Sequence, residues 1–139
     1  MNAFSSVTRV YQLSGALLLT TLLACQKNED PAAAGLQGRW QLTGQQCYCA
    51  PGPVPDEVMV FTDTEYFSYR ESQLVDKGTF KRDNGQICGL PAPDNLLLLT
   101  SASLLLPPIA ARPVINGDTL TLDYGRACDA RFTIYVRVK

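Results

Sequence analysis

The cysteines are the residues of this 139-residue sequence whose type and spacing most clearly define chemistry. Cys47, Cys49, Cys88 and Cys128 follow a fifth cysteine near the N-terminus, Cys25. An even number of cysteines in a small exported domain is typical of disulfides, so we expect two structural disulfides among these four. A metal or redox role is the alternative, but the Cys-x-Cys spacing at 47–49 lacks the paired C-x₂-C pattern of zinc sites.

Acidic residues are numerous, but the sequence contains no histidine. Ser-His-Asp catalysis, Cys-His catalysis and every metal site that needs an imidazole are therefore excluded. The carboxylates fall mostly at predicted turns or on polar strand faces, where solvation accounts for them; they include Asp56, Glu57, Asp63, Glu65, Glu71, Asp76, Asp118 and Asp123. The net charge is −1 without a basic cluster, which excludes a nucleic-acid footprint. We expect a protein that is not an enzyme and that has no metal and no cofactor.

The residues before Cys25 give that cysteine a role. Residues 13–24, LSGALLLTTLLA, follow Arg9 and match the apolar part of a signal peptide. The run is shorter than the roughly 20 residues of a transmembrane helix. It ends in Leu22-Leu23-Ala24-Cys25, which resembles the lipobox of bacterial lipoproteins. The resemblance implies that residues 1–24 are cleaved off and that diacylglycerol is linked to the Cys25 thiol. The alternative is an ordinary secretory signal with an incidental cysteine.

The sequence becomes polar directly after Cys25. Residues 26–35, QKNEDPAAAG, have charges, a proline, small residues and no periodicity. We therefore expect a lipidated, flexible tether over residues 25–35 and a folded domain over residues 36–139. More than one acyl chain gives a stable anchor, so the membrane is a predicted partner. Residues 26–30, QKNED, also resemble the acidic export tag of some Gram-negative surface lipoproteins, with a generic polar tether as the equal alternative. The predicted location is the outer membrane, facing the periplasm or the cell surface.

Short strand patterns separated by turn signals run through the predicted domain. They are LQGRWQLTG, EVMVF, EYFSYRE, LVDKGTFKR, NLLLLTS, PPIAARPVI, TLTLDYG and ARFTIYVRVK. Turn signals occur at Asp83-Asn84-Gly85 and at Asn116-Gly117-Asp118. In the last segment Phe132, Ile134, Val136 and Val138 alternate with Thr133, Tyr135 and Arg137, as they do in a strand. No segment has a sustained helical period, so the pattern predicts an all-β sandwich or barrel.

The first strand carries a family resemblance. Gly38-Arg39-Trp40 resembles the G-x-W start of lipocalins and of small bacterial lipocalin-like lipoproteins. Lys77-Gly78-Thr79-Phe80, the segment GDTLTL and the terminal Tyr135-Val136-Arg137-Val138 follow the same order of elements. The resemblance implies a small eight-stranded up-and-down barrel, plugged at one end by Trp40 with Arg137 packed near it. The chain is shorter than a ligand-carrying lipocalin, and its proline-rich 107–113 segment is unusual.

Two functions follow from this fold. The first is a lipid-anchored, non-enzymatic barrel that binds a small apolar ligand, with Tyr66, Phe67, Tyr69 and Phe80 as candidate pocket residues. The second is an envelope interaction or structural module, including an inhibitor, whose barrel is filled. Its protein partner is unknown. Leu104, Leu105 and Leu106 would form a patch for a partner or ligand if they are exposed together.

The fold also implies a disulfide pattern. In an up-and-down barrel the last strand pairs with the first, so the end of the first lies beside the start of the last. We therefore expect either Cys47 or Cys49 to bond Cys128, and the other to bond Cys88. A bond between Cys47 and Cys49 would close a very small ring. Which of the two takes which partner stays open.

Overall fold

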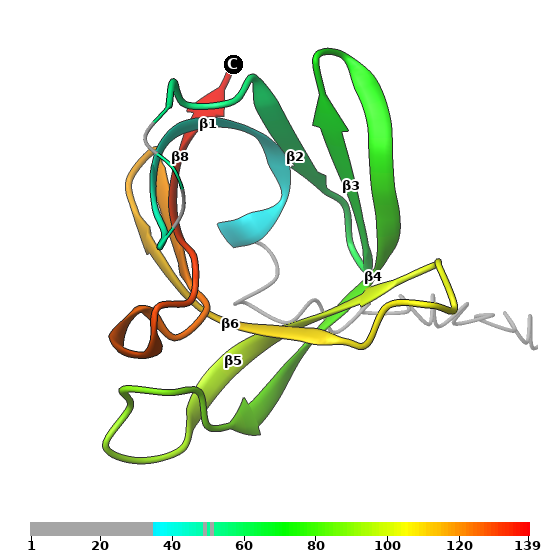
Figure 1. Cartoon of the computed structure of the whole chain (residues 1–139). Helices are drawn as coiled ribbons and strands as arrows, with labels where there is room; N and C mark the ends of the chain where they lie inside the picture. Colours follow the sequence, from blue (N-terminus) through cyan, green and yellow to red (C-terminus); the bar gives the residue numbers. More distant parts are fainter. Residues whose placement is uncertain (1–34, 49, 51) are drawn as a thin grey trace, which may run out of the picture.

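The computed structural model describes residues 35–48, 50 and 52–139, which form one closed barrel (Figure 1). The predicted signal peptide, Cys25, most of the tether and Cys49 lie outside the described residues. Eight antiparallel strands follow each other around the barrel, and the last pairs with the first. They are β1 (Gly38–Gln46), β2 (Glu57–Phe61), β3 (Glu65–Arg70), β4 (Gln73–Gly85), β5 (Asp94–Ser101), β6 (Ile109–Asn116), β7 (Thr119–Asp123) and β8 (Phe132–Val138). The predicted all-β, eight-stranded up-and-down barrel is confirmed.

Strand β8 shows how side chains divide between the two faces of the barrel. Thr133 and Tyr135 are fully buried, whereas Val136 and Val138 are exposed. The register with β1 places Tyr135 beside the buried Leu42. The alternation predicted for this strand is confirmed, and its more polar set faces inward. The outward set is aliphatic, so hydropathy alone would have assigned the two faces of β8 the other way round.

The barrel interior holds one hydrophobic cluster. Its buried members come from the N-terminal turn and from every strand; they are Leu36, Trp40, Leu42, Met59, Phe61, Tyr66, Phe80, Leu97, Leu99, Ala111, Leu120, Leu122 and Tyr135. Phe61 and Phe80 meet edge to face, with ring centroids 5.3 Å apart and planes 87° apart, a favourable arrangement for two aromatic rings. Aromatic side chains from β1, β2, β3, β4 and β8 therefore pack together with aliphatic ones in this cluster.

Two predicted turns have different outcomes. Gly117 adopts a φ of 59° in the tight connection between β6 and β7, where Asn116 pairs with Thr119; the predicted hairpin is confirmed. The turn predicted at Asp83-Asn84-Gly85 is wrong, because β4 continues through these residues. Gly85 still pairs with Asp94 on β5, and the chain reverses only in residues 86–93. Backbone pairing with β5 outweighs the local turn preference of the Asn-Gly sequence.

The predicted disulfide pattern is wrong, although the strand pairing behind it is right. Gln46 at the end of β1 does lie beside Phe132 at the start of β8. Cys128, however, bonds Cys88, with Cα atoms 5.8 Å apart. This bond joins the β4–β5 loop to the connection between β7 and β8, which lie together at the lower left of Figure 1. Cys47 is also disulfide-bonded, but not to Cys88 or Cys128, which bond each other.

The connection between β7 and β8 explains the pairing of Cys128. Arg126–Cys128 form a short 3-10 turn, flanked by Gly125 with φ 110° and Asp129 with φ 63°. Asp123 Oδ1 accepts hydrogen bonds from the amides of Gly125 and Arg126 and fixes the start of this turn. The turn places Cys128 within bonding distance of Cys88 in the β4–β5 loop.

Candidate functional site

A cation–π contact lies where the N-terminal turn meets the barrel. The Arg137 guanidinium carbon lies 4.1 Å from the centroid of the Trp40 ring, which is fully buried. The Trp40 indole N–H donates to the Leu36 carbonyl at 2.7 Å, and Arg137 donates to the carbonyls of Gly35 and Gln37. Figure 1 shows this turn, in cyan, inside the ring of strands. Both residues assigned to the barrel plug thus bind the backbone that precedes β1.

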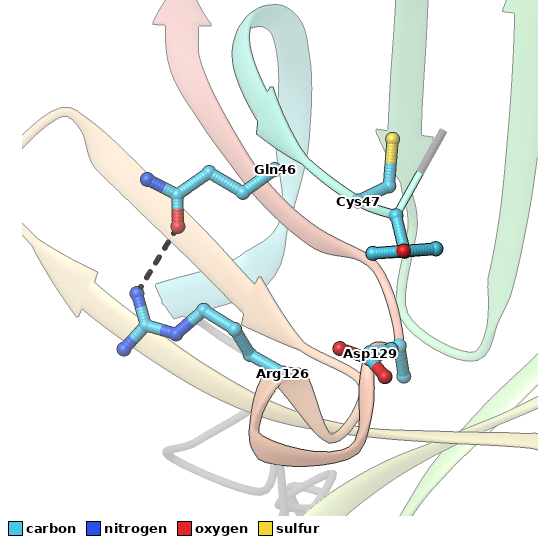
Figure 2. Close-up of a pocket in the computed structure, with 6 residues that line it drawn as sticks. Gln46, Cys47, Arg126 and Asp129 are labelled. Carbon is cyan, nitrogen blue, oxygen red and sulfur yellow. Dashed lines mark hydrogen bonds between the residues drawn. The ribbon is translucent and has the colours of Figure 1, made fainter. Parts of the chain in front are cut away.

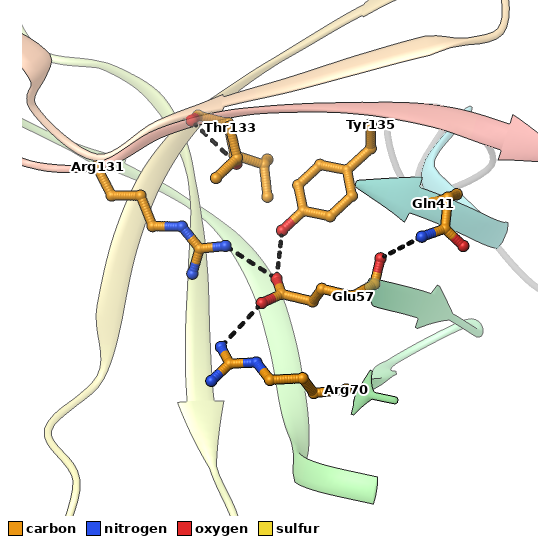
Figure 3. A network of polar contacts seen from close by, with 7 residues as sticks. Gln41, Glu57, Arg70, Arg131, Thr133 and Tyr135 are labelled. Atoms are coloured by element: carbon orange, nitrogen blue, oxygen red, sulfur yellow. Dashed lines mark hydrogen bonds and ion pairs between the residues drawn. The ribbon is translucent and has the colours of Figure 1, made fainter. Parts of the chain in front are cut away.

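A buried carboxylate cluster occupies the interior near the start of β2 and β8. The Glu57 side chain, 5% exposed, binds two guanidinium groups and one phenol (Figure 3). Its Oε1 accepts hydrogen bonds from Arg131 at 3.0 Å and from the Tyr135 hydroxyl at 2.8 Å. Its Oε2 accepts a hydrogen bond from Arg70 at 3.2 Å. Arg70 and Arg131 are 53% and 36% exposed and reach solvent. The cluster therefore connects the barrel interior to the surface.

The electrostatics of this cluster keep Glu57 ionised. Burial alone would raise the pKa of Glu57, but the charge of Arg131 and the hydrogen bonds from Tyr135, Arg70 and Arg131 outweigh it, so the pKa lies below its usual value. Burial, with Tyr124 and Glu57 nearby, raises the pKa of Tyr135. Burial also raises the pKa of Tyr124, to about 12. A carboxylate with a lowered pKa whose two oxygens already bind three donors is a poor general base, and it has no proton to donate near neutral pH, so the arrangement suits a fixed ionic network better than acid–base catalysis.

The sequence held a signal for this cluster that strand reasoning missed. The sequence predicts that Glu57 is one of the acids at turns or on polar strand faces, where solvation accounts for them, and this is wrong for Glu57. Within EVMVF, however, Glu57, Met59 and Phe61 share one face of the strand, and Met59 and Phe61 are large apolar residues. An acid in phase with the core face of a strand points to a buried ionic partner.

A second polar group lies inside the barrel, between β3, β4 and β5. Asp76 Oδ2 accepts from the Tyr66 hydroxyl at 2.7 Å, and its Oδ1 accepts from the Ser101 hydroxyl at 2.6 Å. Burial and the adjacent Asp76 raise the pKa of Tyr66. Asp76, like Glu57, was expected to be a solvated acid, and its carboxylate is instead hydrogen-bonded to two side chains.

The structure does not bring the four candidate pocket aromatics together. Tyr66 and Phe80 are buried members of the core cluster. Phe67 alternates with Tyr66 along β3 and lines an outer depression of about 370 Å³ beside Lys77 and Thr100. Tyr69 lies beyond a register shift between β3 and β4 and lines a different outer depression of about 450 Å³. Strand alternation and this irregularity separate the four rings.

A further small pocket lies beside Cys47, where the end of β1 meets the turn before β8 (Figure 2). Its volume is about 190 Å³, and its lining residues are Gln46, Cys47, Tyr48, Arg126, Asp129 and Ala130. Arg126 donates to Gln46 Oε1 at 3.4 Å and stacks over the Phe132 ring at 4.5 Å. Both contacts hold the Arg126 side chain against the strands at the edge of the pocket.

The predicted leucine patch is exposed. Leu104, Leu105 and Leu106 in the loop between β5 and β6 are 101%, 90% and 52% exposed.

In the part of the chain that the structure describes, no helix is long and apolar enough to span a bilayer, and no three Cys, Asp or Glu side chains are grouped to hold a metal ion. Comparisons with protein-family models, with curated proteins and with solved structures found no match to this chain.

Proposed function

We propose that this protein is a non-enzymatic lipoprotein of the bacterial cell envelope whose filled barrel is a scaffold that acts through its outer surface. The anchor is a lipid on Cys25, and the support for it is the sequence Leu22-Leu23-Ala24-Cys25. The observation that carries the scaffold role is the buried hydrophobic cluster inside the barrel, to which every strand contributes.

Three features of the interior support a scaffold over a carrier. Large rings of the core cluster, including Trp40, Phe61 and Tyr135, are at most 2% exposed. A site for a drug-sized ligand needs roughly 300–1,000 Å³ of largely apolar space, and these rings lie in the part of the barrel where such a site would have to be. The ionised Glu57 cluster and the Asp76 group also line the interior, and an apolar molecule beside them would remove charged groups from water without replacing their partners.

Ligand titration tests this proposal against the competing one, a small apolar ligand inside the barrel. The purified domain from residue 26 onward is titrated with a fluorescent fatty acid, and native mass spectrometry follows the same samples. We expect no saturable binding at micromolar concentration. Phe80→Ala, which opens space for about one ring in the core, is the matched control for a small aromatic probe. Saturable binding by the unmodified domain would favour the carrier function.

The anchor is tested separately by Cys25→Ser in the full chain. We expect the variant to remain unprocessed or to leave the membrane fraction, whereas the neighbouring Gln26→Ser control should partition as the wild type does. Mass spectrometry of the mature N-terminus identifies the acyl chains. Normal processing and membrane association of Cys25→Ser would refute the lipid anchor. Protease shaving of intact cells then distinguishes the periplasmic from the surface orientation.

A further inference from the structure

The loop between β5 and β6 presents aliphatic side chains to solvent without a protein contact that covers them. The amide of Leu106 donates to the carbonyl of Ser103 at 3.2 Å, which closes a β-turn with Leu104 and Leu105 at its central positions. These two leucines are 101% and 90% exposed, and Ile109 at the start of β6 is 49% exposed. The leucines thus form the tip of a projecting loop, seen in yellow at the right of Figure 1.

Strand β4 lies against the base of this loop and carries further exposed aliphatic residues. The amide of Ala102 donates to the Lys77 carbonyl, and the Ser101 hydroxyl donates to Asp76, so the base of the loop lies against the first half of β4. Leu74 and Val75 precede these two β4 residues and are 49% and 53% exposed. From Asn95 to Ala111 the chain has no charged residue.

The backbone of the loop is suited to a surrounding without water. Unsatisfied amides are costly in hydrocarbon because nothing there accepts their hydrogen bonds. Within residues 102–108, the amides of Ala102, Ser103 and Leu106 donate within the protein. Pro107 and Pro108 have no amide hydrogen to satisfy. Five of these seven residues therefore have no free amide donor, and Leu106 is the tip leucine among them.

We propose that the tip of this loop, Leu104, Leu105 and Leu106, inserts into the surface of the lipid bilayer that holds the anchor. This inference rests on the proposed lipid anchor at Cys25. The described chain begins at Gly35, so the residues between it and Cys25 span at most about 35 Å when extended. A domain of this size has a radius of gyration of about 13 Å, so the tether lets the loop side of the barrel face the membrane.

The chemistry of the tip favours lipid over a protein groove. Protein–protein hot spots are rich in Trp, Tyr and Arg, which combine apolar area with a hydrogen-bonding group. The segment LLLPPI at 104–109 has neither aromatic nor polar side chains. Leucine is among the side chains that enter a bilayer most favourably. A convex aliphatic tip needs no matching shape in a fluid hydrocarbon phase.

The test places a tryptophan at the loop tip of the acylated, mature protein. Leu105→Trp is reconstituted into vesicles of phosphatidylethanolamine and phosphatidylglycerol, with or without bromine-labelled acyl chains that quench tryptophan. Val136→Trp is the matched control, because Val136 is exposed on β8, which is separated from β5 by β6 and β7 in the barrel. The native Trp40 is fully buried and contributes the same background to both variants.

We expect bromolipid to quench Leu105→Trp several-fold more than Val136→Trp, and the added substitutions Leu104→Ser and Leu106→Ser to remove most of that difference. Equal quenching of the two variants, with acylation verified by mass, would overturn the inference and leave the anchor intact. Loss of acylation would instead contradict the proposed function. A tryptophan shielded at position 105 without vesicles, in a concentration-dependent way, would show that another copy of the protein covers the loop and would also overturn the inference. Equal urea midpoints establish that both variants fold.

Discussion

Replacing Glu57 by glutamine tests whether the buried ionic cluster stabilises the barrel. Glutamine keeps the size of the side chain and an oxygen that accepts the hydrogen bond from the Tyr135 hydroxyl. It removes the negative charge that Arg131 and Arg70 approach at 3.0 and 3.2 Å. The change therefore leaves two guanidinium groups beside a neutral amide.

The magnitude follows from the exposure of the partners. Removing one member of a buried ion pair costs about 3–5 kcal/mol, because the other charge stays buried without compensation. Arg70 and Arg131 are 53% and 36% exposed and recover part of their hydration, so we expect the lower end, about 3 kcal/mol. For a domain of this size this corresponds to a melting temperature lower by about 12 °C. The urea midpoint should fall by about 2 M.

The effect has a defined pH dependence. The pKa of Glu57 is lower in the folded barrel than the value of about 4.3 in an unfolded chain. Its contribution is therefore complete above the unfolded pKa and disappears as the pH falls through the folded pKa, because the unfolded chain takes up the proton first. The difference between wild type and Glu57→Gln should be constant above about pH 5 and shrink below about pH 4.

Urea unfolding followed by tryptophan fluorescence, with disulfides intact, measures both quantities from pH 3 to pH 8. Glu65→Gln, a substitution of the same type at an exposed position, is the control, and its free energy of unfolding should lie within about 0.5 kcal/mol of wild type. A Glu57→Gln penalty below about 1 kcal/mol at pH 7 would show that solvent already compensates the charges. A penalty unchanged at pH 3 would refute the ionic explanation.

Three further perturbations have expected outcomes. Trp40→Ala should lower stability by about 3–5 kcal/mol in urea, and Arg137→Met by less; equal losses would mean that the cation–π contact dominates. Replacing Cys88 and Cys128 by alanine opens a bond with a sequence separation of 40 and should cost about 4 kcal/mol under non-reducing conditions; an unchanged midpoint would contradict this bond. Gly78→Ala places a Cβ against the Thr100 carbonyl oxygen, so circular dichroism should show a disrupted sheet, and a native spectrum with a normal melting temperature would contradict the close approach of β4 and β5.

Most strand positions could be predicted because the alternation and the residue types that mark a strand are local features of the sequence. EVMVF coincides with β2, and the Asn116-Gly117 turn occurs where glycine accommodates a positive φ. The turn expected at Asn84-Gly85 failed because β5 offers backbone partners to those residues. A local preference is weaker than several ladder hydrogen bonds, and the sequence pattern alone does not count those bonds.

The interior site was harder to predict, because polar and apolar side chains share it. Glu57 and Asp76 were assigned to solvent from their residue type, yet both bind partners inside the barrel. Those partners are distant in sequence: Tyr135 is separated from Glu57 by 78 residues and Arg131 by 74. No local window contains both members of such a pair.

The sequence by itself determined the positions of most strands, the two-residue alternation and the turn at Gly117, since these patterns lie among neighbouring residues. Only the tertiary structure decided which face of β8 turns inward and which cysteine Cys128 meets. Closing a sheet of eight strands brings distant residues together in a register set by strand tilt, bulges and loop paths. Thr133 and Tyr135 face inward because β1 and β7 present their core faces to them. Cys128 meets Cys88 because a turn after β7, stabilised by Asp123, redirects the chain.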